Sequence, residues 1–242
     1  MATAATPAPP EAKASVWEDF LDIFYAPSQV FARRSDGKFG LALLVLVILA
    51  GILLYAAMQA LDAAYTGELE RGLARAAQQN PGMTPEQAEA GRSFGRIMMM
   101  ISGVVIVPIS VMLTGIVLWL VGKLFDSVQT LGQALMVATY AAFPRWVLAA
   151  LVMAIQGFVL DMSSADRIYD ATLSAARFAP EGSSELMLVL LSRIDVFVIW
   201  GTILLGIGLH VTGKVPKARA MIAAFIVWAL ASIPAVLGAM NG

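Results

Sequence analysis

Residues 97–121 read IMMMISGVVIVPISVMLTGIVLWLV, and no formally charged side chain lies between Arg96 and Lys123. A helix of about 18 or more uncharged, predominantly apolar residues is long enough to cross roughly 30 Å of hydrocarbon. This stretch therefore predicts a membrane-spanning helix.

Four further stretches of the 242-residue chain are similarly apolar, although one of them contains Arg145 and another contains Asp195 near its start. Hydrophobic residues make up 59% of the chain and charged residues only 14%, whereas soluble domains carry about 25% charge. The predicted fold class is an all-α integral membrane protein, and a water-soluble globular domain is excluded. The five predicted spans cover approximately residues 39–61, 97–121, 133–160, 194–212 and 220–240.

Composition also argues against several functions. The net charge of −1 lacks the clustered basic residues that nucleic-acid binding requires, so no nucleic-acid partner is expected. The chain has no cysteine and a single histidine, His210, which disfavours disulfide, zinc and haem sites. No phosphate-binding loop, catalytic triad or pair of carboxylates within a span is present. We therefore expect no metal, no cofactor and no enzymatic activity.

The N-terminal region begins with residues 1–14, which are rich in Ala and Pro and are expected to form a disordered tail. Ser15 and Glu18 then form a capping box that starts an amphipathic helix. Its expected membrane-surface or docking face consists of Trp17, Phe20, Leu21 and Phe24. The opposite face carries Glu18, Asp19 and Asp22. Because that polar face is acidic, docking on the protein's own bundle is favoured over binding to the membrane surface.

Five spans place the two termini on opposite sides of the membrane. Short connections on one side carry basic residues close to the spans, namely Arg33, Arg34, Lys38, Lys123, Lys214, Lys217 and Arg219. Such residues mark the cytoplasmic side. The N-terminus is therefore predicted to be cytoplasmic and the C-terminus outside.

Two long segments then lie outside, and each is expected to form a helical hairpin. In residues 62–96 the turn falls at Asn80 to Gly82, and Thr84 caps the second helix. In residues 161–193 the pattern predicts a first helix capped by Ser163 or Ser164 and a turn near Pro180. It also predicts a second helix that is capped by Ser183 or Ser184 and runs into the fourth span.

Arg145 is the main candidate functional residue, because an arginine inside a span costs on the order of 2.5–3.5 kcal/mol. It follows Pro144, which removes a backbone donor from the helix. One interpretation is a functional break, with Arg145 paired to Asp126 or Asp195. The other places Arg145 near the cytoplasmic edge, where its side chain reaches the headgroups.

Two other polar residues are candidates for a functional or structural role. Asp195 stands at the boundary of the fourth span, where an interfacial charge is expected, and His210 stands near its other end. Small residues at a spacing of four recur in the third and fifth spans. They predict close helix packing, within the bundle or between two copies of the chain. These residues are Ala134, Ala138, Ala142, Ala231, Ala235 and Ala239.

Several short strings resemble the Yip1 family of five-span membrane proteins, in particular its bacterial members. One is APSQVF at residues 26–31. Two others, GQAL at residues 132–135 and TYAAFP at residues 139–144, belong to the similar stretch 122–144, and the turn region 206–220 is similar too. The resemblance covers roughly residues 16–240 and implies one Yip1-like membrane domain over residues 15–240. It also implies a cytoplasmic N-terminus, an outside C-terminus and, for a bacterial source, a location in the inner membrane.

The resemblance implies architecture more than function. Eukaryotic relatives are implicated in membrane traffic and in binding prenylated GTPases, but this chain has a very short N-terminal region and long outside segments, which place GTPase binding in doubt. The leading hypothesis is a non-enzymatic scaffold or accessory subunit that organises protein partners or lipid. Its expected partners are membrane lipid and other membrane proteins or a second copy of itself. The alternative is a small transporter or channel that uses the Pro144-Arg145 break.

Overall fold

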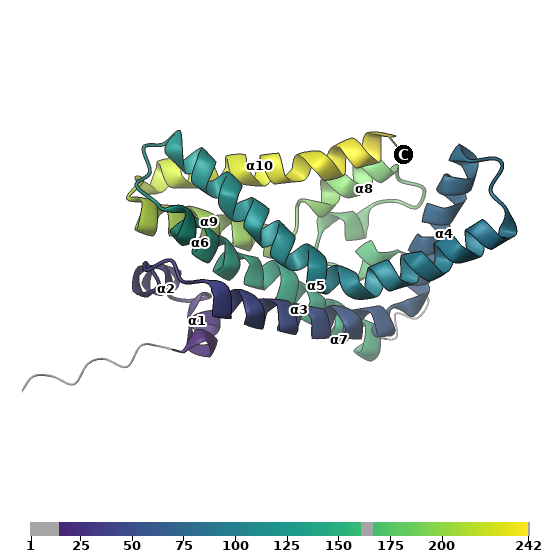
Figure 1. Cartoon of the computed structure of the whole chain (residues 1–242), viewed down its shortest axis with the longest axis horizontal. Coiled ribbons are helices and arrows are strands. Elements are labelled where there is room, and N and C mark those ends of the chain that lie inside the picture. The colour runs from purple at the N-terminus through teal and green to yellow at the C-terminus, as the bar shows by residue number, and fades with distance from the viewer. Residues whose placement is uncertain (1–14, 161–166, 242) are drawn as a thin grey trace, which may run out of the picture.

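A computed structural model describes residues 15–160 and 167–241, which form an elongated helical bundle (Figure 1). The N-terminal helices lie at one end of the bundle and the C-terminus lies at the other. The α-helices are α1 (Val16–Asp22), α2 (Pro27–Arg33), α3 (Gly40–Ala60), α4 (Asp62–Gln79), α5 (Pro85–Lys123), α6 (Leu131–Phe143), α7 (Ala149–Val159), α8 (Glu185–Ser192), α9 (Val196–Gly213) and α10 (Lys217–Asn241). The described residues contain no β-strand.

Five helical segments are long and apolar enough to cross a membrane, as the all-α membrane bundle requires. They are Gly40–Ala60, Val104–Lys123, Leu131–Val159, Val196–Gly213 and Lys217–Met240. The second covers the C-terminal half of α5 and overlaps the predicted span at residues 97–121. That helix nevertheless continues without a break from Pro85 to Lys123, over 39 residues.

Local sequence signals explain where two of the long helices begin. The Thr84 hydroxyl accepts a hydrogen bond from the Gln87 amide, and the Gln87 side chain accepts one from the Thr84 amide, which starts α5. Thr130 and Gln133 start α6 in the same way. The predicted cap at Thr84 is confirmed.

The interior of the bundle consists mainly of apolar side chains from α1, α2, α3, α5, α6, α9 and α10. Leu46, Leu118, Met136 and Leu204 are completely buried within it. Ala134 and Ala138 are also buried inside the bundle, so these small residues serve intramolecular packing. Small side chains also allow α7 to approach α3 closely, because a Cβ atom at Gly157 would lie 2.8 Å from the carbonyl oxygen of Ala60.

The first predicted hairpin is present. Helix α4 and the N-terminal part of α5 pack side by side and project past the end of the bundle that carries the C-terminus (Figure 1). The Arg92 guanidinium contacts the Glu70 carboxylate at 2.7 Å and so joins the two helices. We call residues 62–103 the arm, and we call this end of the molecule the arm end.

The second predicted hairpin is wrong in its first helix. Residues 167–184 contain only two short 3-10 turns, at Ile168–Ala171 and Ala175–Phe178. Hydroxyl groups compete with helix formation here, since Thr172 donates to the carbonyl of Tyr169 and also accepts from the amide of Ser174. Ser174 then pairs with Asp195 in an isolated antiparallel bridge. The predicted caps at Ser163 and Ser164 lie outside the described residues.

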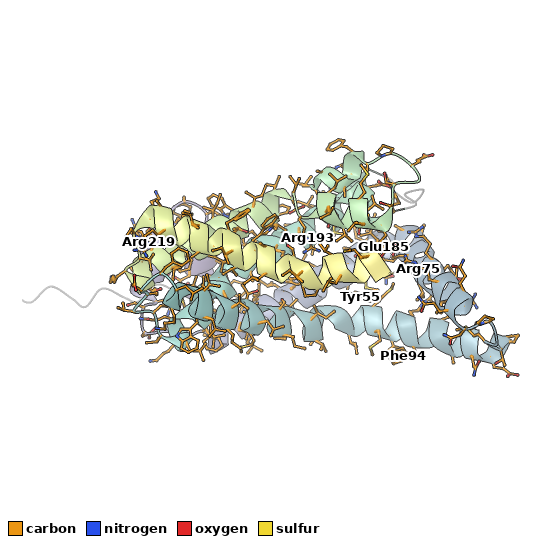
Figure 2. The ribbon with its side chains drawn as sticks, turned by 90° about the horizontal axis from the view of Figure 1, so that it is seen from above. Tyr55, Arg75, Phe94, Glu185, Arg193 and Arg219 are labelled. Atoms are coloured by element: carbon orange, nitrogen blue, oxygen red, sulfur yellow. The ribbon has the colours of Figure 1, made fainter. Side chains whose placement is uncertain are left out.

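Helix α8 is present and begins at the predicted cap Ser184, whose hydroxyl accepts from the Met187 amide. It ends at Ser192 and does not run into the fourth span, because the chain turns at residues 193–195 before α9 begins. The Arg75 guanidinium of α4 contacts the Glu185 carboxylate of α8 at 2.5 Å (Figure 2). This ion pair connects the arm to the second outside segment.

At the opposite end, the predicted capping box of Ser15 and Glu18 starts α1, and Pro27 is the first residue of α2. The loop that follows approaches the start of α6 closely. Gly37 adopts φ +74°, and a Cβ atom there would lie 3.0 Å from the Gln133 amide nitrogen, so glycine is required at this position. The predicted disordered tail at residues 1–14 lies outside the described residues.

Candidate functional site

The first notable site is the contact between the N-terminal helices and the bundle. The Asp19 carboxylate is completely buried and forms ion pairs with two consecutive arginines of α2 and its C-terminal cap. The Arg33 Nε lies 2.7 Å from one carboxylate oxygen, and the Arg34 Nε lies 2.5 Å from the other. The Tyr140 hydroxyl of α6 donates a third hydrogen bond to Asp19, at 3.1 Å. A buried carboxylate needs such partners to offset its loss of hydration.

Aromatic packing beside this carboxylate attaches α1 to α6. The Phe20 ring stacks on Phe143 with a centroid distance of 4.4 Å and lies 5.3 Å from the Tyr140 ring. Phe24 meets Phe143 edge to face at 6.1 Å. Together with the completely buried Ile23, these residues make α1 a part of the bundle.

The predicted docking face of α1 is therefore only half right. Phe20 and Phe24 contact the bundle, whereas Trp17 and Leu21 are 58% and 66% exposed. The assignment of Asp19 to the outward polar face is wrong. Two arginines from α2 neutralise its charge, which allows this acidic residue to occupy the inner face of the helix.

A smaller polar contact lies at the edge of this site. The Tyr25 hydroxyl and the Arg33 guanidinium both donate to Asp22. The hydrogen bond from Tyr25, followed by that from Arg33, lowers the pKa of Asp22 below its ordinary value. The same bond raises the pKa of Tyr25, since losing the hydroxyl proton would place two negative charges together.

The second notable site is a break in the third span. Residues Pro144–Leu148 form one turn of π-helix between α6 and α7, and the Ala149 amide donates to the Pro144 carbonyl. Proline has no amide hydrogen, so it cannot continue the regular hydrogen-bond ladder of α6. Single π-turns of this kind often occur at functional positions. The predicted break at Pro144 is present as a local widening of a continuous helix.

Arg145 and Arg193 line one cavity next to this break. The cavity has a volume of about 360 Å³ and lies between α5, the third span, α9 and α10. Its walls are mainly apolar and include Val117, Phe197, Leu205 and Val227. The lining also contains two tryptophans and four hydroxyl residues: Trp146, Trp228, Ser110, Thr114, Thr202 and Ser232. We call it the arginine cavity.

The ion pairs predicted for Arg145 do not form. Asp126 contacts Arg219 at 3.4 Å, at the end opposite the arm. The Asp195 carboxylate is buried and accepts hydrogen bonds from the amides of Phe197 and Val198, which makes it the N-cap of α9. The Arg145 guanidinium lies 5.5 Å from the Trp146 ring centroid and forms no ion pair within residues 15–160 and 167–241.

His210 has a local structural contact. Its Nδ1 lies 2.7 Å from the carbonyl oxygen of Val215, which can only accept, so Nδ1 donates. This bond spans the turn between α9 and α10. Nowhere in the described parts of the chain do three His, Asp or Glu side chains gather as a metal site would require.

Two residues of these sites were not recognised in the sequence. Tyr140 belongs to a string that resembles the Yip1 family, but no pattern pointed to its bond with Asp19. Arg193 ends the second outside segment, two residues before Asp195, and no sequence pattern distinguishes it. In the structure it lies between Arg219 at one end of the bundle and Glu185 toward the arm end (Figure 2). The break between α8 and α9, which places Arg193 there, had no clear sequence signal.

Five long apolar helices, a docked N-terminal helix and a helical arm at one end define a five-span integral membrane protein. The chain belongs to the Yip1 domain family, whose model matches residues 21–238. It is also similar to the protein described as "Membrane protein YknW" of Bacillus subtilis (strain 168), with 23% identity over 186 residues, covering 77% of this chain and 75% of that protein. No solved structure matches the chain.

Family membership confirms the resemblance identified from the short strings, and the structure shows what those strings do. Gln133 belongs to the cap of α6 and also donates to the carbonyl of Ser35 at 2.8 Å. Tyr140 and Phe143 form the surface that receives α1. In residues 26–31, Val30 and Phe31 of α2 are completely buried. The strings thus form the contact between the N-terminal helices and the bundle.

Proposed function

We propose that this Yip1-family protein is a non-enzymatic scaffold or accessory subunit that organises protein partners or lipid in the membrane. The observation that carries the proposal is an exposed apolar stripe on the arm. Phe94, Ile97, Met98 and Ile101 are all exposed and recur at the spacing of one helix face. They lie where the arm joins the segment Val104–Lys123, which is long and apolar enough to cross a membrane.

The arm is built so that this stripe stays available. The Arg92–Glu70 ion pair attaches α4 to another side of α5. The two helices also approach closely at Gly91, where an added Cβ atom would lie 3.0 Å from the Leu73 side chain. Figure 2 shows Phe94 on the arm, directed away from the body of the bundle. A contiguous exposed apolar surface is typical of a protein or membrane contact. We assign it to a membrane-protein partner or a second copy of the chain.

The proposal includes an orientation. The basic connections before α3, between α5 and α6, and between α9 and α10 lie together at the end opposite the arm (Figure 1). Basic residues close to the spans favour the cytoplasmic side. The N-terminus is then cytoplasmic, the arm lies outside, and a bacterial chain of this kind lies in the inner membrane.

A non-enzymatic role is consistent with the contacts of the buried polar residues. Asp19 holds α1, and Asp195 caps α9. The Gln156 side chain donates to the Ala171 carbonyl and accepts from Arg177. Each of these groups already has a partner that fixes the fold.

Single-cysteine photocrosslinking tests the proposal, and the natural absence of cysteine gives a clean background. A benzophenone attached at Phe94→Cys or Ile97→Cys should form a discrete protein adduct in native membranes. Ile48→Cys, on an exposed face of α3 within the first span, is the matched control and should label lipid alone. A chain that gives only lipid adducts at all three positions, and purifies as a monomer without bound protein or lipid, would contradict the proposal.

A second candidate function is a small transporter or channel. The π-turn at Pro144–Leu148 beside the arginine cavity favours it, because broken helices at the depth of the membrane often build transport sites. Replacing Arg145 by Leu separates the two functions. A transporter should lose activity in a liposome flux assay, whereas a scaffold should form the same crosslinks as the unchanged protein.

A further inference from the structure

The arginine cavity places two cations in mainly apolar surroundings without a carboxylate. Among the described residues that line it, Arg145 and Arg193 are the charged members, and neither forms an ion pair. The Arg193 Nε is buried and has no hydrogen-bond partner in the described chain. The described protein leaves this buried nitrogen of Arg193 without an acceptor, and an anion in the cavity would supply one.

The hydrogen-bond donors of the cavity point to the same conclusion. The hydroxyls of Ser110, Thr202 and Ser232 each donate to a carbonyl of their own helix. Their hydrogens are therefore engaged, and the two guanidinium groups remain the main donors to a bound ligand. Guanidinium groups bind phosphate oxygens through paired, charge-assisted hydrogen bonds.

The walls and the opening of the cavity indicate that the anion carries an acyl chain. Leu113 of α5 and Leu230 of α10 belong to the lining and are 57% and 43% exposed. Both lie within segments that can cross the membrane, so the cavity opens sideways between α5 and α10 toward hydrocarbon. A free inorganic anion would have to enter through this apolar opening, whereas a lipid can enter from the bilayer.

We propose that the arginine cavity binds one anionic phospholipid, with its phosphate between Arg145 and Arg193 and an acyl chain passing between α5 and α10. Arg193 precedes α9 on the arm side and Arg145 lies deeper, at the centre of the third span. The headgroup of the bound lipid would thus lie deeper in the membrane than the headgroups of the surrounding lipids. The site is distant from the apolar stripe of the arm and goes beyond the partner-binding role, so either idea can fail without the other.

Native mass spectrometry of the full chain tests the site. The protein is released from mixed micelles that contain equal amounts of phosphatidylglycerol and phosphatidylcholine, and the bound lipid is identified by mass. We expect one phosphatidylglycerol per chain, enriched about tenfold over phosphatidylcholine, because both lipids offer a phosphodiester but the choline cation of phosphatidylcholine would be repelled by the two arginines. Equal retention of both lipids would overturn the proposal.

Substitutions then locate the lipid. Arg145→Gln and Arg193→Gln should each reduce the enrichment about tenfold. Arg219→Gln removes a basic residue at the other end of the bundle, 50% exposed as a side chain, and should leave the enrichment unchanged. If Arg219→Gln lowers the enrichment as much as the cavity variants do, the lipid binds by surface charge and the proposal fails.

Two further variants distinguish a loss of lipid binding from a loss of the folded state. Arg145→Lys keeps the charge but loses the paired geometry, so it should retain part of the enrichment. Ala231→Phe adds an apolar ring at the cavity wall and should exclude the lipid without changing any charge. Each variant must elute as the unchanged protein does in gel filtration. Wild-type retention of the lipid by a correctly eluting Ala231→Phe protein would contradict the assigned position.

An inorganic phosphate competition separates a lipid site from a free-anion site. Millimolar phosphate should not displace the bound phosphatidylglycerol, because the acyl chain contributes apolar contacts that a free ion lacks. Complete displacement by phosphate would show that the cavity is an anion site, and the lipid assignment would be wrong.

Discussion

The Tyr140 hydroxyl donates a hydrogen bond to the completely buried Asp19 carboxylate at 3.1 Å, and so joins α1 to the last turn of α6. Arg33 and Arg34 neutralise the same carboxylate. Because the four groups come from three different helices, the N-terminal region is a component of the bundle. A contact of this kind fixes the position of α1 where a purely apolar contact would allow it to slide.

The first prediction concerns this carboxylate. Asp19→Asn keeps the shape of the side chain but removes its charge, which leaves Arg33 and Arg34 beside a neutral group. We expect a loss of about 3 kcal/mol in the free energy of unfolding, as is typical when one partner of a buried ion pair is removed. Faster trypsin cleavage at Arg33 and Arg34 would show that α1 and α2 have detached.

Asp36→Asn is the matched control for that measurement. Asp36 contacts Lys38 at 3.8 Å, and both side chains are well exposed. An exposed pair contributes only about 0–1 kcal/mol, so protease sensitivity and stability should remain close to those of the unchanged protein. Equal effects of the two substitutions would mean that the buried network is not the principal attachment of α1.

The second prediction distinguishes the two faces of α1. Phe20→Ala removes a ring that stacks on Phe143, and we expect a cost of about 3–5 kcal/mol. Leu21→Ala, at the neighbouring exposed position, should change stability by less than about 0.5 kcal/mol. Chemical unfolding in detergent measures both values. The reverse order would show that the originally predicted face, with Leu21 inward, is the packed one.

Much of the architecture could be predicted because it depends on local sequence. Long apolar runs indicated all five spans, with Arg145 interrupting the third, and the capping residues Ser15, Thr84 and Ser184 indicated where helices begin. The inward position of Asp19 could not be predicted in this way. A helical pattern assigns a charged residue to the outer face, and the partners that reverse the assignment lie on other helices.

Contacts between residues that are distant in sequence also explain why the second outside segment and the arginine cavity could not be predicted. The Ser174–Asp195 bridge joins residues that are distant in sequence, and it replaces the predicted helix by an extended turn. That turn separates α8 from α9 and brings Arg193 to the cavity that Arg145 lines. Arg145 could be recognised as unusual because it interrupts an apolar run. The position of Arg193 beside the same cavity depends on tertiary structure and could not be predicted.

The third prediction concerns the pH dependence of the arm. The hydrogen bond from Arg92 lowers the pKa of Glu70 below its ordinary value of 4.5. Because the folded pKa is the lower one, this ion pair contributes to stability above pH 4.5 and its contribution is lost as the pH falls through the lowered pKa. We therefore expect the arm to loosen only in acid.

Pulsed electron paramagnetic resonance can measure this change. Spin labels at Ala74→Cys in α4 and Ala90→Cys in α5 occupy exposed positions on the two helices of the arm. The distance distribution should be narrow near neutral pH and should broaden below about pH 4. Glu70→Gln should be broad at both pH values. A narrow distribution in Glu70→Gln would show that apolar packing alone holds the arm together.

The fourth prediction concerns the stability of the arginine cavity. In detergent without added phospholipid, Arg145→Leu should unfold at the same temperature as the unchanged protein or at a higher one. The substitution removes a cation from mainly apolar surroundings where no carboxylate pairs with it. Adding phosphatidylglycerol should then stabilise the unchanged protein more than the variant. A large loss of stability in lipid-free detergent would contradict this account of Arg145.

The most direct test of the central claim, a membrane scaffold that does not transport, is thiol accessibility across residues 136–150. The cysteine-free chain allows each of these positions to be changed to cysteine and labelled with a membrane-impermeant reagent from either side. We predict that each position is unreactive or reacts from one side alone, with the same pattern under all conditions. Reaction of positions next to Arg145 from both sides, in different states of the protein, would contradict the scaffold and establish a transport pathway.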